Sequence, residues 1–68
     1  MSNQEWNAYF RARLAEAEKE LREFRQAVRD HGLRVWHRDI NGERDMTASE
    51  DQVLQSQVDE YRAALKDD

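Results

Sequence analysis

The sequence predicts a mainly α-helical fold: a long helix, a short β-hairpin or loop, and a second helix that runs antiparallel to the first. Three observations lead to this prediction. Apolar residues recur every three or four positions in both halves of the chain, an Asn-Gly pair stands between them, and the 68 residues include no proline and two glycines. We expect helices at 3–31 and 48–66 and the hairpin or loop at 33–46, within a single small domain.

The first helix is predicted from one apolar seam, whose positions step by 4, 3, 4, 3 and 4. This is the spacing of a helix that packs lengthwise against other helices. Ser2 to Glu5 has the pattern of a capping box at the start, and Gly32 can end the helix in the left-handed conformation. The seam consists of Phe10, Leu14, Ala17, Leu21, Phe24 and Val28.

The connecting segment is predicted to be a hairpin because Asn41-Gly42 is a strong short turn signal. With these two residues as the turn, Asp39 faces Arg44 and Arg38 faces Asp45, so two cross-strand pairs join opposite charges. An isolated hairpin is weak in water, so this one is expected to lean on the helices. A loop with the same turn is the alternative. The side chains expected to pack on the helices are Leu33, Val35, Trp36 and Met46.

The second helix is predicted to begin with a capping box at Thr47-Ala48-Ser49-Glu50. Its apolar positions step by 4, 3 and 4, which gives a seam that faces the first one if the helices are antiparallel. Small Ala17 then lies under large Tyr61. This second seam consists of Leu54, Val58, Tyr61 and Leu65.

The second helix is the shorter one, so Trp6, Tyr9 and Phe10 are expected to project beyond its end. Three aromatic side chains in water form an apolar patch of a kind that monomers rarely expose. Together with Trp36 they are the predicted interaction surface. A chain this short is marginally stable, and without cysteine it has neither disulfides nor thiolate zinc ligands. We therefore expect a homodimer that forms a four-helix bundle, and one protein partner.

No residue pattern points to catalysis, a cofactor or a metal. His31 and His37 have no standard ligand spacing. The segment that starts at His37 resembles a calcium loop, but the first and twelfth ligand positions hold His37 and Ala48. Carboxylate pairs such as Glu16 with Glu20 fall on polar helix faces, where no concave pocket is implied. The expected function is a non-catalytic, self-associating interaction module.

The net charge of −4 comes from the last third of the chain, so a basic face for nucleic acid is not expected. The acidic second helix could instead mimic a nucleic-acid backbone toward a basic protein. No apolar run could span a membrane, and no signal peptide is visible at the N-terminus. With the absence of cysteine, these features favour the cytoplasm.

Residues 42–54 resemble the small head-completion (gpW-like) proteins of tailed phages. The similar features are the turn Gly42-Glu43-Arg44 and the segment Thr47-Ala48-Ser49 that leads into the last helix. The first helix is longer than in that family and the C-terminal end is acidic. The resemblance implies a virion protein whose hairpin faces a portal ring. The alternative function is therefore a phage-type protein, either a head–tail connector or an acidic inhibitor of a host protein.

Overall fold

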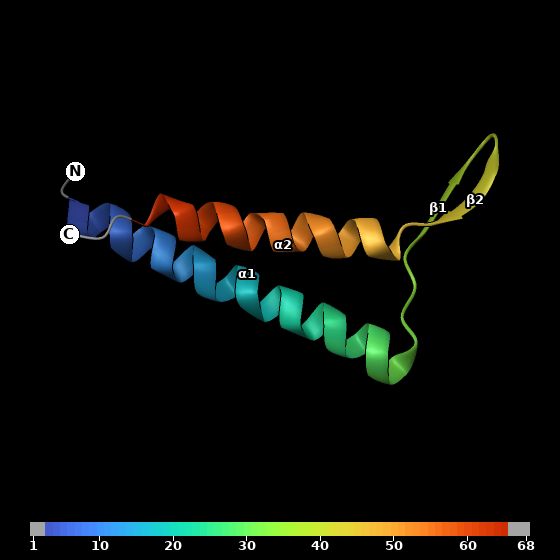
Figure 1. Cartoon of the computed structure of the whole chain (residues 1–68), viewed down its shortest axis with the longest axis horizontal. Coiled ribbons are helices and arrows are strands. Elements are labelled where there is room, and N and C mark those ends of the chain that lie inside the picture. The colour runs from blue at the N-terminus through green and yellow to red at the C-terminus, as the bar shows by residue number, and fades with distance from the viewer. Residues whose placement is uncertain (1–2, 66–68) are drawn as a thin grey trace.

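The computed structural model describes residues 3–65, which form a helix, two strands and a second helix. Helix α1 spans Asn3–His31, strand β1 Trp36–Asp39, strand β2 Gly42–Asp45 and helix α2 Thr47–Ala64. Figure 1 shows the helices running in opposite directions, with the hairpin at the end where the chain turns back. The predicted pair of helices joined by a short antiparallel hairpin is confirmed.

The start of the first predicted helix and the end of the second are only partly described. Ser2 of the first predicted cap and Lys66 at the predicted end of the second helix lie outside the described residues. α1 ends at His31 because Gly32 adopts a φ of +67°, which is left-handed and costs glycine little. The amide of Leu33 then donates to the carbonyl oxygen of Ala27 at 3.2 Å and closes the last turn.

The turn of the hairpin lies one residue earlier than predicted. Asp39 pairs with Gly42, so Ile40 and Asn41 form the turn and the predicted Asn41-Gly42 turn is wrong. The cause is the Asp39 carboxylate, which accepts a hydrogen bond from the Asn41 amide at 2.8 Å. Gly42 takes a φ of +117° at the start of β2.

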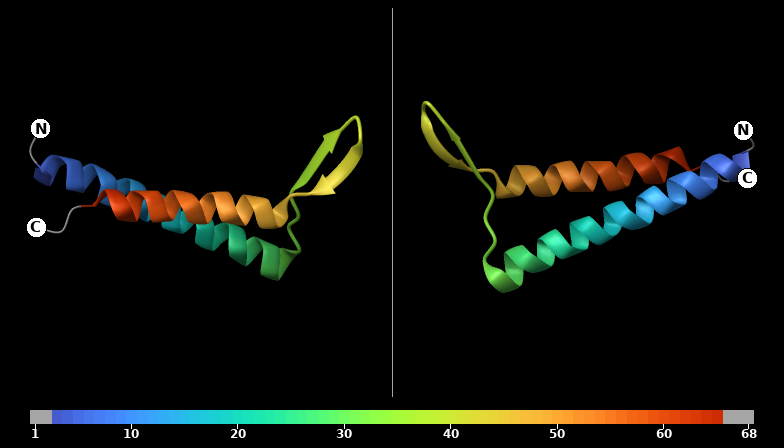
Figure 2. Two further views of the ribbon diagram at one scale, coloured as in Figure 1. Left: turned by 45° about the horizontal axis from the view of Figure 1, so that its top comes forward. Right: turned by 180° about the vertical axis from the view of Figure 1, so that it is seen from behind.

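Because the turn lies one residue earlier, the cross-strand pairs also differ from the predicted ones. Arg38 stands opposite Glu43, with which it forms an ion pair, rather than opposite Asp45. Arg44 still reaches Asp39 at 3.3 Å, but diagonally. The hairpin was expected to pack on the helices, but it does not, since Trp36 is 61% exposed. Figures 1 and 2 show it projecting from the end of the helix pair.

The predicted capping box at the start of α2 is wrong as well. Met46 is the N-cap residue and makes no side-chain cap hydrogen bond. The Thr47 hydroxyl is instead used by the hairpin, because its oxygen accepts from the Val35 amide at 2.9 Å. Asp45 provides the cap, since its carboxylate accepts from the Thr47 amide at 3.0 Å at the positive end of the helix.

The core is a small cluster between the two helices. Ala17, Leu21 and Val58 are the apolar side chains that the described residues bury. Tyr61 packs against this cluster, which includes Ala17, the residue that it was predicted to cover. Two further seam residues, Leu14 and Leu54, pack there while remaining partly exposed.

The seam opens toward the hairpin. In Figures 1 and 2 the helices diverge from the end near the chain termini toward the hairpin end. Phe24 and Val28 are therefore only half-buried, and with Ala48 they line an open groove of about 330 Å³. Leu65, the last residue of the predicted seam, is half-buried directly after α2.

Candidate interaction surfaces

The N-terminal aromatic residues form a cluster on α1. The Phe10 ring centroid lies 5.9 Å from that of Trp6, in a stacked arrangement, and 5.3 Å from that of Tyr9. The Phe10 ring centroid also lies 6.5 Å from that of Tyr61 on α2. Contrary to expectation, Phe10 therefore does not project beyond the second helix. Trp6 and Tyr9 are 47% and 54% exposed. The exposed part of the predicted aromatic patch is thus smaller than the sequence implied.

Trp36 does not belong to the same surface. It lies on β1, at the opposite end of the molecule from the N-terminal half of α1 (Figure 1). Ile40, which the sequence analysis did not select, is fully exposed at the turn beyond it. The four predicted interaction residues are therefore divided between two separate places, the aromatic cluster and the hairpin.

The hairpin is joined to the helices by a polar cluster of Arg34, Val35, Asp45 and Thr47. The Asp45 carboxylate accepts hydrogen bonds from the Thr47 hydroxyl and amide, and from Arg34 Nε at 2.8 Å. These bonds stabilise the charged form and lower the pKa of Asp45 to about 2. Thr47 is buried, so the cluster holds the hairpin at a defined point.

Asn7 is a buried polar residue that the sequence analysis missed. It is only 7% exposed. The signal was present in the spacing, because Asn7 continues the seam three residues before Phe10. A polar residue at such a position usually specifies how helices pair, at some cost in stability.

Arg25 connects the helices where they begin to diverge. Its Nε and Nη2 donate to the two Asp51 carboxylate oxygens at 2.9 and 3.0 Å, and Nη2 also donates to Gln55 Oε1 at 2.9 Å. This two-pronged contact lowers the pKa of Asp51. Arg25 therefore provides a polar contact between α1 and α2.

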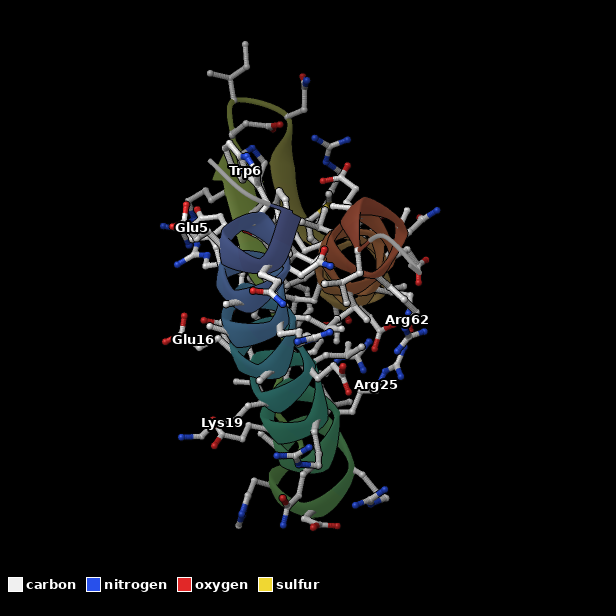
Figure 3. The ribbon with its side chains drawn as sticks, turned by 90° about the vertical axis from the view of Figure 1, so that its left-hand side faces the viewer. Glu5, Trp6, Glu16, Lys19, Arg25 and Arg62 are labelled. Carbon is white, nitrogen blue, oxygen red and sulfur yellow. The ribbon has the colours of Figure 1, made fainter. Side chains whose placement is uncertain are left out.

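Two further open grooves lie between α1 and α2, on opposite sides of the core. The first, here called the basic groove, has a volume of about 670 Å³ and lies over Leu21 and Val58. In Figure 3, which looks along the helix pair, Arg25 of α1 and Arg62 of α2 lie on the same side. The charged residues lining the basic groove are Glu18, Arg22, Arg25, Arg29 and Arg62.

The second, the acidic groove, has a volume of about 430 Å³ and lies over Ala17 and Tyr61. Figure 3 shows Glu16 on the side of α1 away from Arg25 and Arg62. The charged residues lining the acidic groove are Arg13, Glu16, Glu20 and Glu60. Acidic and basic residues are interleaved along the sequence of α1, so this separation could not be predicted from their order in the chain.

Among residues 3–65, no group of three or more His, Cys, Asp or Glu side chains could hold a metal ion. Neither α1 nor α2 is long and apolar enough to cross a membrane.

Comparison with known proteins gives no relative for this chain. No protein-family model, no curated protein and no solved structure matches it. The resemblance of residues 42–54 to phage head-completion proteins therefore rests on the quoted residues alone.

Proposed function

We propose that this protein is a small non-catalytic interaction module that self-associates, with two copies stacking their helix pairs into a four-helix bundle. In this proposal it acts by binding a protein partner, and it uses neither a cofactor nor a metal. The observation that carries the proposal is the single layer formed by α1 and α2.

The first support is the excess of exposed surface. The chain exposes 5581 Å², whereas a compact monomer of this mass exposes about 4,500 Å². Its radius of gyration is 15.7 Å, against about 11 Å for a compact domain of this length. The excess of roughly 1,000 Å² is close to the ~800 Å² that each partner contributes to a standard protein–protein interface. A second copy would supply the missing contact.

The second support is the thickness of the molecule. Its extents are 49 × 28 × 14 Å, so the shortest one has room for one layer of helices. Stable domains are built from at least two packed layers, because a single layer leaves one side of every element in water. Stacking two copies would provide the second layer.

Size-exclusion chromatography with light scattering at micromolar concentration tests the proposal, and we expect a mass of at least twice that of the chain. Trp6 gives a second measurement in the Trp36→Phe variant, where it is the remaining tryptophan. We expect its emission to shift to shorter wavelength as the concentration rises. A strict monomer in which Trp6 emits as it does in water at every concentration would contradict the proposal.

A second candidate function follows from the hairpin, which carries the exposed side chains of Trp36 and Ile40. A projecting hairpin with apolar side chains is suited to docking on a large assembly, which is the role implied by the resemblance to phage head-completion proteins. In this case Trp36→Ala would abolish capture of the partner without loss of helix content. Recovery of the same partner by the wild type and the variant would exclude the hairpin as the binding element.

A further inference from the structure

We propose that copies of this chain associate head to tail, with the basic groove of one copy lying on the acidic groove of the next. This inference rests on the proposed self-association and names the two surfaces that meet. The occupant of each groove is therefore a second copy of the same chain.

The basic groove has guanidinium groups available for a partner. Arg22 forms no ion pair with any residue that the structure describes, and Arg29 pairs only with its neighbour Asp30 within that range. Arg62 lies 4.0 Å from Glu18, a long and exposed contact. Arg25 is the arginine of this groove that is fully engaged, through Asp51 and Gln55. Three cationic side chains thus face the solvent on one side of the helix pair.

The acidic groove has the complementary charges. Glu20 of α1 and Glu60 of α2 form no ion pair within residues 3–65, whereas Glu16 lies 3.6 Å from Arg13. Each helix therefore contributes one unpaired carboxylate to this side. Since exposed charges that meet opposite charges guide association and fix the relative position of the partners, the two grooves are suited to each other.

The positions along the helices also agree. Glu20 and Arg22 are two residues apart on α1, and Glu60 and Arg62 are two residues apart on α2. Two residues correspond to about 3 Å along a helix and about 200° around it. Each pair therefore stands at nearly the same height on opposite sides of its helix. In the proposed contact, Glu20 of one copy therefore meets Arg22 of the next, and Glu60 meets Arg62.

A two-fold dimer that meets through either groove is unfavourable, because a two-fold axis brings the same surface of both copies together. It would place Arg22 and Arg62 against a second set of arginines, or Glu20 and Glu60 against a second set of carboxylates. A head-to-tail contact avoids this repulsion, and it leaves one groove of each kind free at the ends. The dimer is then the first step, and further copies add as the concentration rises.

Two charge-reversed variants test the inference. In Arg22→Glu/Arg62→Glu both grooves are acidic, and in Glu20→Arg/Glu60→Arg both are basic. We expect each variant alone to need at least about tenfold higher concentration to associate than the wild type. An equimolar mixture of the two should associate as the wild type does, because opposite grooves meet again. Sedimentation velocity at low and high salt measures all three samples, and high salt should weaken association.

Controls keep these results interpretable. Arg38 and Glu43 form an ion pair on the hairpin, which projects from the end of the helix pair in Figure 1, and neither residue lines a groove. Arg38→Glu and Glu43→Arg change the charge in the same two directions outside the grooves and should associate as the wild type does. Circular dichroism checks the helix content. If a double variant loses helix, the single variants Arg22→Glu and Glu20→Arg are measured in the same mixing experiment.

The outcomes separate this inference from the proposed function. A wild type that stays monomeric contradicts self-association itself, and the head-to-tail contact with it. A wild type that associates while both variants also associate normally supports self-association and overturns the groove contact. Variants that are both monomeric and do not recover on mixing overturn the head-to-tail pairing as well. The head-to-tail contact is supported if each variant alone associates less than the wild type and the mixture of the two recovers association.

Discussion

At the scale of single residues, the carboxylate of Asp45 determines how the hairpin meets α2. It accepts hydrogen bonds from the amide and hydroxyl of Thr47 and from Arg34, so it serves the helix end and the hairpin together. A carboxylate with several donors is stabilised in its charged form and is well placed at the positive end of a helix. The joint therefore depends on one negative charge.

The stability of the protein should fall in acid because of this charge. The pKa of Asp45 is lowered from 3.8 to about 2 in the folded chain, so its contribution is complete above pH 3.8 and is lost as the pH falls through about 2. In the Asp45→Asn variant the side-chain amide can still accept from Thr47 but carries no charge. We expect Asp45→Asn to be less stable than the wild type at neutral pH and to lose less stability between pH 4 and pH 2. Urea unfolding followed by circular dichroism measures this, and parallel pH profiles would contradict it.

The Thr47 hydroxyl should matter more than an ordinary surface hydroxyl. It is buried, accepts from the Val35 amide at 2.9 Å and donates to Asp45. Thr47→Ala leaves the Val35 amide without its acceptor, which costs about 1–3 kcal/mol of unfolding free energy. Thr47→Ser keeps the hydroxyl and is the matched control. Equal denaturant midpoints for the two variants would show that the Thr47 hydroxyl does not stabilise the contact between the hairpin and α2.

The role of Thr47 could not be predicted from local sequence. The pattern Thr47-Ala48-Ser49-Glu50 fits a capping box, and a capping box uses only donors within four residues. The donor that the hydroxyl actually binds, the Val35 amide, is twelve residues away and becomes available only when the hairpin has formed. Asp45 then supplies the cap that Thr47 does not. Non-local competition of this kind is invisible to a local pattern.

At the scale of elements, the seam of α1 predicted the pairing of the helices but not its extent. The 3,4 spacing identified Ala17, Leu21 and Val58, which form the buried cluster. It did not predict that the helices diverge, which leaves Phe24 and Val28 half-buried. Spacing defines the face of a helix that packs, whereas the angle between helices depends on how the side chains of the two faces fit together.

The buried cluster is small, so each member should carry a large share of the stability. Val58 is 2% exposed and Val53, on the same helix, is 51% exposed. We expect Val58→Ala to lower the unfolding free energy by about 1–3 kcal/mol, because it removes buried methyl groups and leaves a cavity. Val53→Ala is the control, with the same change of helix propensity and an effect within about 0.5 kcal/mol. Chemical denaturation of both variants at one protein concentration gives the comparison, and similar losses would place the core elsewhere.

The hairpin shows how one side chain can move a turn. The Asn41-Gly42 pair predicted the hairpin correctly as an element. The turn moved to Ile40-Asn41 because Asp39 accepts from the Asn41 amide. Both registers pair opposite charges, so charge pairing could not choose between them. The exposure of Ile40 follows from the observed register and could not be foreseen.

At the scale of the whole molecule, the net charge of −4 conceals two sides of opposite character. Counting charges along α1 gives a balance, and the balance argued against any basic face. The pairing of α1 with α2 places arginines from both helices around the basic groove and carboxylates around the acidic groove. Which charges act together therefore depends on the side of the helix pair on which they lie, and not on their position in the chain.

Self-association should make thermal stability depend on protein concentration. If two copies are needed to complete the fold, a tenfold increase in concentration favours the folded dimer by about 1.4 kcal/mol. With the usual unfolding entropy per residue for both chains, this raises the midpoint of thermal unfolding by about 5 °C for each tenfold step. Circular dichroism melts at micromolar and at tenfold and hundredfold higher concentrations measure the shift. A midpoint that stays constant over this range would mean that the single layer of α1 and α2 is stable without a second copy.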